Sequence, residues 1–116
     1  MIGFSLGAYY ALGLSVERPQ AVRAVVAFYG MRRQDYAAAQ ASYLGHFAEH
    51  DEYVSASGLK DLEKSLRKAG RPATLYTYPG TGHWFFESDR SEAYDAQPAE
   101  LAWERTLQFL RGALAR

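Results

Sequence analysis

The chain has 116 residues, a length typical of one domain built around one hydrophobic core. Acidic and basic residues number 13 each and form no run of like charge, which argues against nucleic acid or an anionic membrane surface as the main partner. There is no cysteine, and the sequence shows neither a signal peptide nor an apolar run near the roughly 20 residues that span a bilayer. We therefore expect a soluble, cytoplasmic protein that acts on a small, roughly neutral molecule without a metal or cofactor.

Helical and strand patterns alternate along the first half of the chain. Residues 5–16, SLGAYYALGLSV, are almost all apolar or small and stop ahead of Pro19, which predicts a buried helix. Residues 22–30, VRAVVAFYG, form a β-branched run that predicts a buried strand. Residues 31–42 are polar and alanine-rich, so we expect a loop with at most a helical turn. Residues 43–51, YLGHFAEHD, predict a second strand that runs into acidic residues.

The same alternation continues in the second half. A helix is predicted from a Ser57 cap to Lys68, because its leucines share one stripe and glycine and proline follow it. Residues 73–83, ATLYTYPGTGH, predict a third strand, and Pro98 opens a last helix that runs to Leu114. This order predicts an α/β fold with about three parallel strands flanked by helices. In such sheets the chemistry lies beyond the carboxyl ends of the strands.

A G-x-S-x-G motif occupies residues 3–7, GFSLG. In α/β-hydrolases this pattern forms the nucleophile elbow, a sharp strand-to-helix turn that presents a serine at the top of a parallel sheet. Only Met1 and Ile2 precede the motif, so little sequence is available for the strand that should lead into it. The motif is short, and Ser5 could instead be the N-cap of the helix that follows.

A serine nucleophile needs a base that takes its proton, and three histidines are available. His46 lies inside the second predicted strand, where a buried structural histidine is the better interpretation. His83 lies in the glycine-rich stretch PGTGHWFFE after the third strand, which can present a side chain at the carboxyl edge of the sheet. His50 is the alternative base, disfavoured because it adjoins the candidate acid on the same short loop.

Asp51, in AEHDEYV, is the candidate acid, because it follows the second predicted strand and so reaches the same edge. Glu49 and Glu52 stand beside it, so a solvated acidic turn is the alternative interpretation. The chain order Ser5, Asp51, His83 is the order of the catalytic triad in α/β-hydrolases. We therefore predict that these three residues form a triad.

Several motifs together resemble one known family over essentially the whole chain. The segments GFSLGA, VRAVVAFYG, HFAEHDEYV, YPGTGHWFFE and LAWERTLQFL resemble the carboxyl-terminal half of the dienelactone hydrolase family. The resemblance implies a truncated α/β-hydrolase fold, with residues 1–116 as a single domain that lacks the family's amino-terminal half. It also implies that Ser5 is the nucleophile, Asp51 the acid and His83 the base, and that the backbone N–H of Leu6 forms half of the oxyanion hole.

The sequence departs from the family pattern in three ways. The best-known members have cysteine as the nucleophile, so Ser5 is more similar to a serine esterase of the same superfamily. An arginine that holds the substrate carboxylate in members acting on dienelactone is replaced by Glu87, which argues against an anionic lactone. The family's amino-terminal half supplies the second oxyanion donor, and loss of one such donor typically costs about 100- to 1,000-fold in rate.

These observations favour a serine hydrolase that acts on small carboxylic esters or lactones through an acyl-serine intermediate. Tyr29 and Trp84 are candidates for the substrate pocket, whereas for Phe85 and Phe86 core packing is at least as good an interpretation. The alternative is an inactive fragment or pseudoenzyme of the family that acts, if at all, as an oligomeric interaction domain. A thin sheet with an uncovered edge also predicts a homodimer or higher homo-oligomer.

Overall fold

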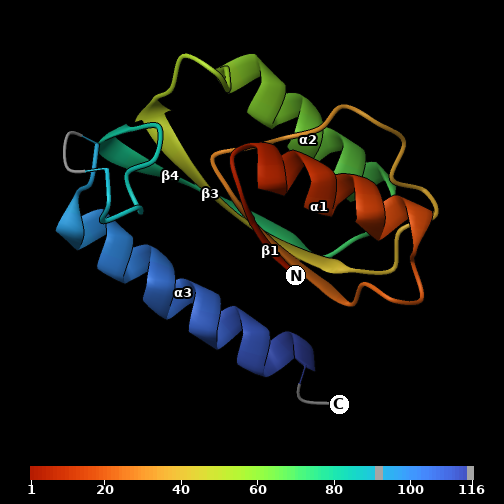
Figure 1. The fold of residues 1–116 in the computed structure, drawn as a ribbon. Coiled ribbons are helices and arrows are strands. Elements are labelled where there is room, and N and C mark those ends of the chain that lie inside the picture. The colour runs from red at the N-terminus through yellow and green to blue at the C-terminus, as the bar shows by residue number, and fades with distance from the viewer. Residues whose placement is uncertain (91–92, 115–116) are drawn as a thin grey trace.

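A four-stranded parallel sheet forms the centre of the computed structural model, which describes residues 1–90 and 93–114 (Figure 1). Its strands lie in the order β1-β2-β3-β4 and span Ile2–Phe4, Ala24–Phe28, Ser42–His50 and Ala73–Gly82. Every neighbouring pair is parallel. The predicted α/β class is therefore confirmed, with one strand more than the three that the sequence indicated.

The additional strand is β1, which has three residues. It pairs in parallel with β2 over the same length, so that Ile2 lies opposite Val26 and Phe4 opposite Phe28. A segment this short has no periodicity of its own, because pairing with a buried neighbour rather than local pattern makes it a strand. The strand expected to lead into the G-x-S-x-G motif is thus present.

Three helices cover the two faces of the sheet. They are α1 (Leu6–Glu17), α2 (Ala56–Lys68) and α3 (Ala96–Leu114), with α1 and α2 on one face and α3 on the other (Figure 1). The cap of α2 is Ser55, whose hydroxyl accepts a hydrogen bond from the N–H of Gly58, and not the expected Ser57. In the part of the chain that the structure describes, no helix is both long and apolar enough to cross a membrane.

Two hydrophobic cores lie on opposite sides of the sheet. Between the sheet and the helices α1 and α2, Leu12, Val25 and Leu66 pack together. Between the sheet and α3, Phe28 and Tyr78 pack with further apolar residues. All five residues of β2 are buried because this strand contributes to both cores, which explains its continuous apolar run.

The parallel topology brings four loops to one edge of the sheet. Ser5 directly follows β1, Tyr29 follows β2, Asp51 follows β3 and His83 follows β4. Residues from distant parts of the sequence therefore meet at the carboxyl ends of the strands, where open parallel sheets hold their functional groups.

Candidate active site

Ser5 occupies a sharp turn between β1 and α1. Its φ of 55° lies in the left-handed region that non-glycine residues rarely adopt. The N–H of Ser5 donates to the carbonyl of Phe28 at 2.8 Å, which ties the turn to the end of β2. Ser5 occupies the N-cap position of α1, as the alternative interpretation expected, but its side chain makes no capping hydrogen bond and its hydroxyl contacts another part of the chain.

Two glycines give this turn the room that it needs. A Cβ on Gly3 would lie 2.4 Å from the carbonyl oxygen of Gly7, and a Cβ on Gly30 would lie 2.3 Å from the carbonyl oxygen of Ser5. Both distances are too short for any side chain, so β1 and the loop after β2 approach the turn only because these positions lack one. Gly30 belongs to a different loop, and the sequence motif alone did not assign it to the elbow.

His83 connects the serine to a carboxylate. Its Nε2 lies 2.9 Å from Ser5 Oγ, and its Nδ1 lies 2.6 Å from Asp51 Oδ2. An ionised carboxylate can only accept, so Nδ1 carries the hydrogen and Nε2 is left to accept the hydrogen of the serine hydroxyl. The side chains of His83 and Asp51 are only 6% and 1% exposed. The structure thus brings together the three residues that the sequence predicted.

The second oxygen of Asp51 fixes the orientation of this carboxylate. Asp51 Oδ1 accepts hydrogen bonds from the backbone N–H groups of Tyr53 and Val54, at 2.8 and 3.2 Å. The loop after β3 therefore aims Oδ2 at His83. This geometry is not that of the solvated acidic turn considered as the alternative.

The other two histidines are placed elsewhere. His46 is completely buried in β3, with Nδ1 2.7 Å from the Tyr78 hydroxyl and Nε2 2.9 Å from Thr106 Oγ1. Burial, assisted by the nearby Arg105, lowers the pKa of His46 from 6.5 to about 3, so the ring is neutral and structural, as expected. His50 is exposed, and its nearest ionic partner is Glu49 at 3.2 Å.

Tyr29 lies behind His83 rather than in a pocket. The two ring centres are 4.9 Å apart, and the Tyr29 hydroxyl donates to Glu87 Oε2 at 2.5 Å. Tyr29 is completely buried, and burial raises the pKa of its phenol above the ordinary value, so it remains a neutral donor. The expectation that Tyr29 lines the substrate pocket is therefore wrong, because its ring faces no surface that a substrate could reach.

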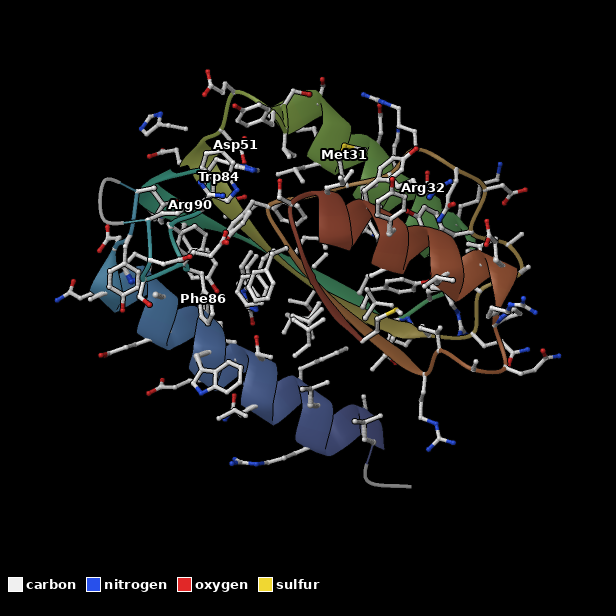
Figure 2. The ribbon with its side chains drawn as sticks, in the orientation of Figure 1. Met31, Arg32, Asp51, Trp84, Phe86 and Arg90 are labelled. Atoms are coloured by element: carbon white, nitrogen blue, oxygen red, sulfur yellow. The ribbon has the colours of Figure 1, made fainter. Side chains whose placement is uncertain are left out.

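A cleft of about 820 Å³ opens beside the imidazole. Its lining residues are His50, Glu52, Gly82, His83, Trp84, Asp89, Arg90 and Ala93. Trp84 is one of these lining residues, and Asp51, Trp84 and Arg90 gather at one end of the molecule (Figure 2). Arg90 was not anticipated, because a single arginine in a polar loop gives no sequence signal that it faces the cleft.

The two phenylalanines after Trp84 belong to the packing. Phe85 is completely buried in the core under α3. The ring centre of Phe86 lies 4.6 Å from that of Phe28 and 6.3 Å from that of Trp103 on α3, both in tilted contacts. For both residues the structure agrees with the core-packing interpretation.

Leu6, directly after the serine, is the first residue of α1. Its backbone N–H has no intrahelical acceptor, because the first turn of any helix leaves its N–H groups unpaired. The position is that of the oxyanion donor which the family resemblance implies. Among residues 1–90 and 93–114, no group of three or more His, Asp or Glu side chains is arranged to hold a metal ion.

Comparison with known proteins identifies the family. The sequence model of the dienelactone hydrolase family matches residues 1–114. The chain belongs to this family. A relative from Saccharolobus solfataricus, provisionally named a carboxymethylenebutenolidase, is 37% identical over 95% of the chain and 42% of its own length. A Bradyrhizobium protein with the provisional name 2-oxo-3-(5-oxofuran-2-ylidene)propanoate lactonase is 32% identical over 96% of the chain and 49% of its own length.

Solved structures of family-like proteins share the fold. A dienelactone hydrolase-like promiscuous phosphotriesterase from metagenomic libraries superposes with a TM-score of 0.87 at 20% identity, covering 97% of this chain and 51% of that one. An α/β-hydrolase from a Medee basin deep-sea metagenome gives a TM-score of 0.77 at 21% identity, covering 99% of this chain and 54% of that one. The expected α/β-hydrolase fold is confirmed, and the chain spans about half the length of the proteins it matches.

Proposed function

We propose that this chain holds the catalytic triad of a serine hydrolase that cleaves small carboxylic esters or lactones. The observation that carries the proposal is the continuous hydrogen-bonded series from Ser5 through His83 to Asp51, with distances of 2.9 and 2.6 Å. The names of the relatives, a carboxymethylenebutenolidase and a lactonase, support a lactone or ester substrate.

In the proposed mechanism each member of the triad has one role. Ser5 Oγ attacks the carbonyl carbon while Nε2 of His83 takes the hydroxyl proton, and Asp51 stabilises the imidazolium that forms. The backbone N–H of Leu6 donates to the oxyanion of the tetrahedral intermediate. When the C–O bond of the ester breaks, Nε2 returns the proton to the leaving alkoxide, which leaves an acyl group on Ser5. Water activated by His83 then releases the carboxylic acid.

A serine depends on the base more strongly than a cysteine does. A thiol is partly ionised near neutral pH, whereas a hydroxyl must lose its proton during attack, so the contact between Ser5 and His83 is essential. The second oxyanion donor is expected, from the family resemblance, in the half of the fold that these residues do not include. Without it, turnover would be about 100- to 1,000-fold lower.

The substrate is proposed to be uncharged near the base. Glu87 occupies the place of the arginine that the resemblance associates with a substrate carboxylate, and it accepts the Tyr29 hydroxyl instead. No arginine at this position would then hold a substrate carboxylate. Trp84, which lines the cleft, would contact the apolar part of the ester.

A fluorophosphonate probe tests the proposal directly, because it phosphonylates only an activated serine. We expect labelling of Ser5 that is abolished in Ser5→Ala and retained in Ser57→Ala, a control at an exposed serine. Labelling that survives Ser5→Ala would contradict the assignment. A folded chain that takes no label would favour the alternative, an inactive fragment or pseudoenzyme that acts as an oligomeric interaction domain.

A further inference from the structure

Strained backbone within the described residues is concentrated around the triad. Three non-glycine residues have positive φ there: Ser5 at 55°, Tyr29 at 39° and Trp84 at 67°. For Ser5 the turn itself explains the strain. Trp84 is a bulky residue in a conformation that glycine adopts without cost, and it directly follows His83. Its side chain must therefore make contacts that offset the strained backbone.

The indole of Trp84 packs against the catalytic imidazole. The two ring centres are 4.6 Å apart, and Tyr53 adds a second ring whose centre lies 4.8 Å from that of His83. Trp84 and Tyr53 also contact each other, at 5.8 Å between ring centres. With Tyr29 behind it, the imidazole is enclosed by three aromatic rings, which explains why its side chain is only 6% exposed beside an open cleft.

Further contacts hold Trp84 and Tyr53 in place beside His83. The guanidinium of Arg90 lies 4.1 Å from the centre of the Trp84 ring and 3.9 Å from Glu87, which in turn accepts the Tyr29 hydroxyl. The backbone N–H of Tyr53 donates to Asp51, the acid of the triad. Figure 2 shows Arg90 and Trp84 approaching this end of the sheet from the loop after β4.

We infer that Trp84, with Tyr53, is a positioning residue that keeps water away from the hydrogen bond between His83 and Asp51. This bond is stronger in a water-excluded environment, where it holds the imidazole in the tautomer that accepts the Ser5 proton. The catalytic role inferred for Trp84 and Tyr53 rests on the proposed hydrolase function. The exclusion of water by these two side chains does not depend on that function.

Proton NMR measures the exclusion of water without any substrate. The hydrogen on Nδ1 of His83, assigned by its loss in His83→Gln, should give a far-downfield resonance in the wild-type chain because it is protected from exchange. Trp84→Gly should lose this resonance by exchange, and its fold should persist because glycine accepts a φ of 67°. Trp84→Phe should keep it, as should Trp103→Ala, a control that removes an exposed indole on α3.

Tyr53→Ala provides a second test, because this ring is 64% exposed and its removal does not disturb a core. It should speed the exchange of the same hydrogen. A wild-type chain without the protected resonance, or unchanged exchange in both Trp84→Gly and Tyr53→Ala, would overturn the inference.

Fluorophosphonate labelling separates the two proposals. Trp84→Gly should label roughly ten- to a hundredfold more slowly than wild type, because small losses of alignment cost rates of this order. Equal labelling rates in the two chains would overturn the positioning role. A wild-type chain that shows the protected resonance but takes no label would support the exclusion of water by Trp84 and Tyr53 and would contradict the proposed hydrolase function.

Discussion

At the scale of single residues, His83 is the group on which the site depends. Both of its ring nitrogens are used, one toward Ser5 and one toward Asp51. No other histidine can replace it, because His46 uses its nitrogens for Tyr78 and Thr106, and His50 points to solvent. In the proposed mechanism, removal of the imidazole would leave the serine hydroxyl without a base.

The first prediction follows from this arrangement. His83→Ala should lower ester turnover, and the rate of fluorophosphonate labelling, by several powers of ten. His50→Ala is the matched control, because it removes an exposed imidazole near the same cleft, and it should leave both rates unchanged. A large loss in His50→Ala with unchanged thermal stability would mean that the wrong histidine has been assigned as the base.

At the scale of elements, the turn between β1 and α1 requires a glycine where the backbone approaches itself closely. A Cβ on Gly3 would collide with backbone at 2.4 Å, whereas a Cβ on Gly7 would meet nothing within 4 Å. The two glycines of the motif therefore differ in their physical role. Only the first is required by close approach of the chain to itself.

This difference predicts opposite effects on stability. Gly3→Ala should destabilise the fold by about 1–3 kcal/mol, because backbone must shift to admit the methyl group. Gly7→Ala should stabilise it by up to about 1 kcal/mol, because alanine has the higher helix propensity. Urea unfolding followed by circular dichroism gives both values. Equal midpoints for the two variants would contradict the collision inferred at Gly3.

A second feature at this scale is the attachment of α3 to the sheet. Thr106 of α3 contacts Nε2 of the buried His46, while Tyr78 of β4 contacts its Nδ1. The bonds join β3, β4 and α3 in one network. Its integrity requires that the imidazole remain uncharged, since a buried imidazolium beside Arg105 would be unfavourable.

The network predicts loss of stability in acid. The pKa of His46 is lowered to about 3, so between that pH and 6.5 the unfolded chain binds a proton that the folded chain does not. The free energy of unfolding should therefore rise with pH across this window, and on acidification it should fall by up to about 1.4 kcal/mol per pH unit. Urea unfolding at several pH values measures the slope. His46→Gln should reduce the slope and His50→Gln should not; an unchanged slope in His46→Gln would count against the network.

At the scale of the whole molecule, exposed apolar side chains concentrate in the first ten residues. Met1, Ile2, Phe4, Leu6 and Tyr10 are all exposed, Leu6 at 63% and Tyr10 at 57%. They lie on or directly before β1, which is at one edge of the described sheet, and on the first turns of α1. An uncovered edge strand beside an apolar surface favours association with another chain.

We therefore predict that these 116 residues, produced by themselves, form a homodimer or higher homo-oligomer whose interface includes residues from Met1 to Val16. Leaving ~400 Å² of apolar surface in water would cost on the order of 10 kcal/mol, which is comparable to the stability of a small domain. Light scattering at micromolar concentration tests this, with Ile2→Lys as a variant that places a charge on the edge strand and should shift the population toward monomer. A wild-type monomer whose unfolding does not depend on protein concentration would refute the prediction.

The sequence by itself determined the fold class and the candidate residues of the proposed triad. Alternating helix and strand patterns are local properties, and they predict a parallel sheet whose loops meet at one edge. Ser5 could be chosen from the G-x-S-x-G motif, and Asp51 and His83 because each lies at the carboxyl end of a predicted strand. The family resemblance rests on the same local motifs.

Only the tertiary structure decided the features that depend on contacts across the chain. Ser5 and His83 are 78 residues apart, so their hydrogen bond follows from the packing of β1 through β4 and from no local pattern. The strand β1 exists because β2 pairs with it, and Tyr29 is buried because the loop after β4 folds over it. The enclosure of His83 by Tyr53 and Trp84 arises in the same way, since two separate loops supply the rings.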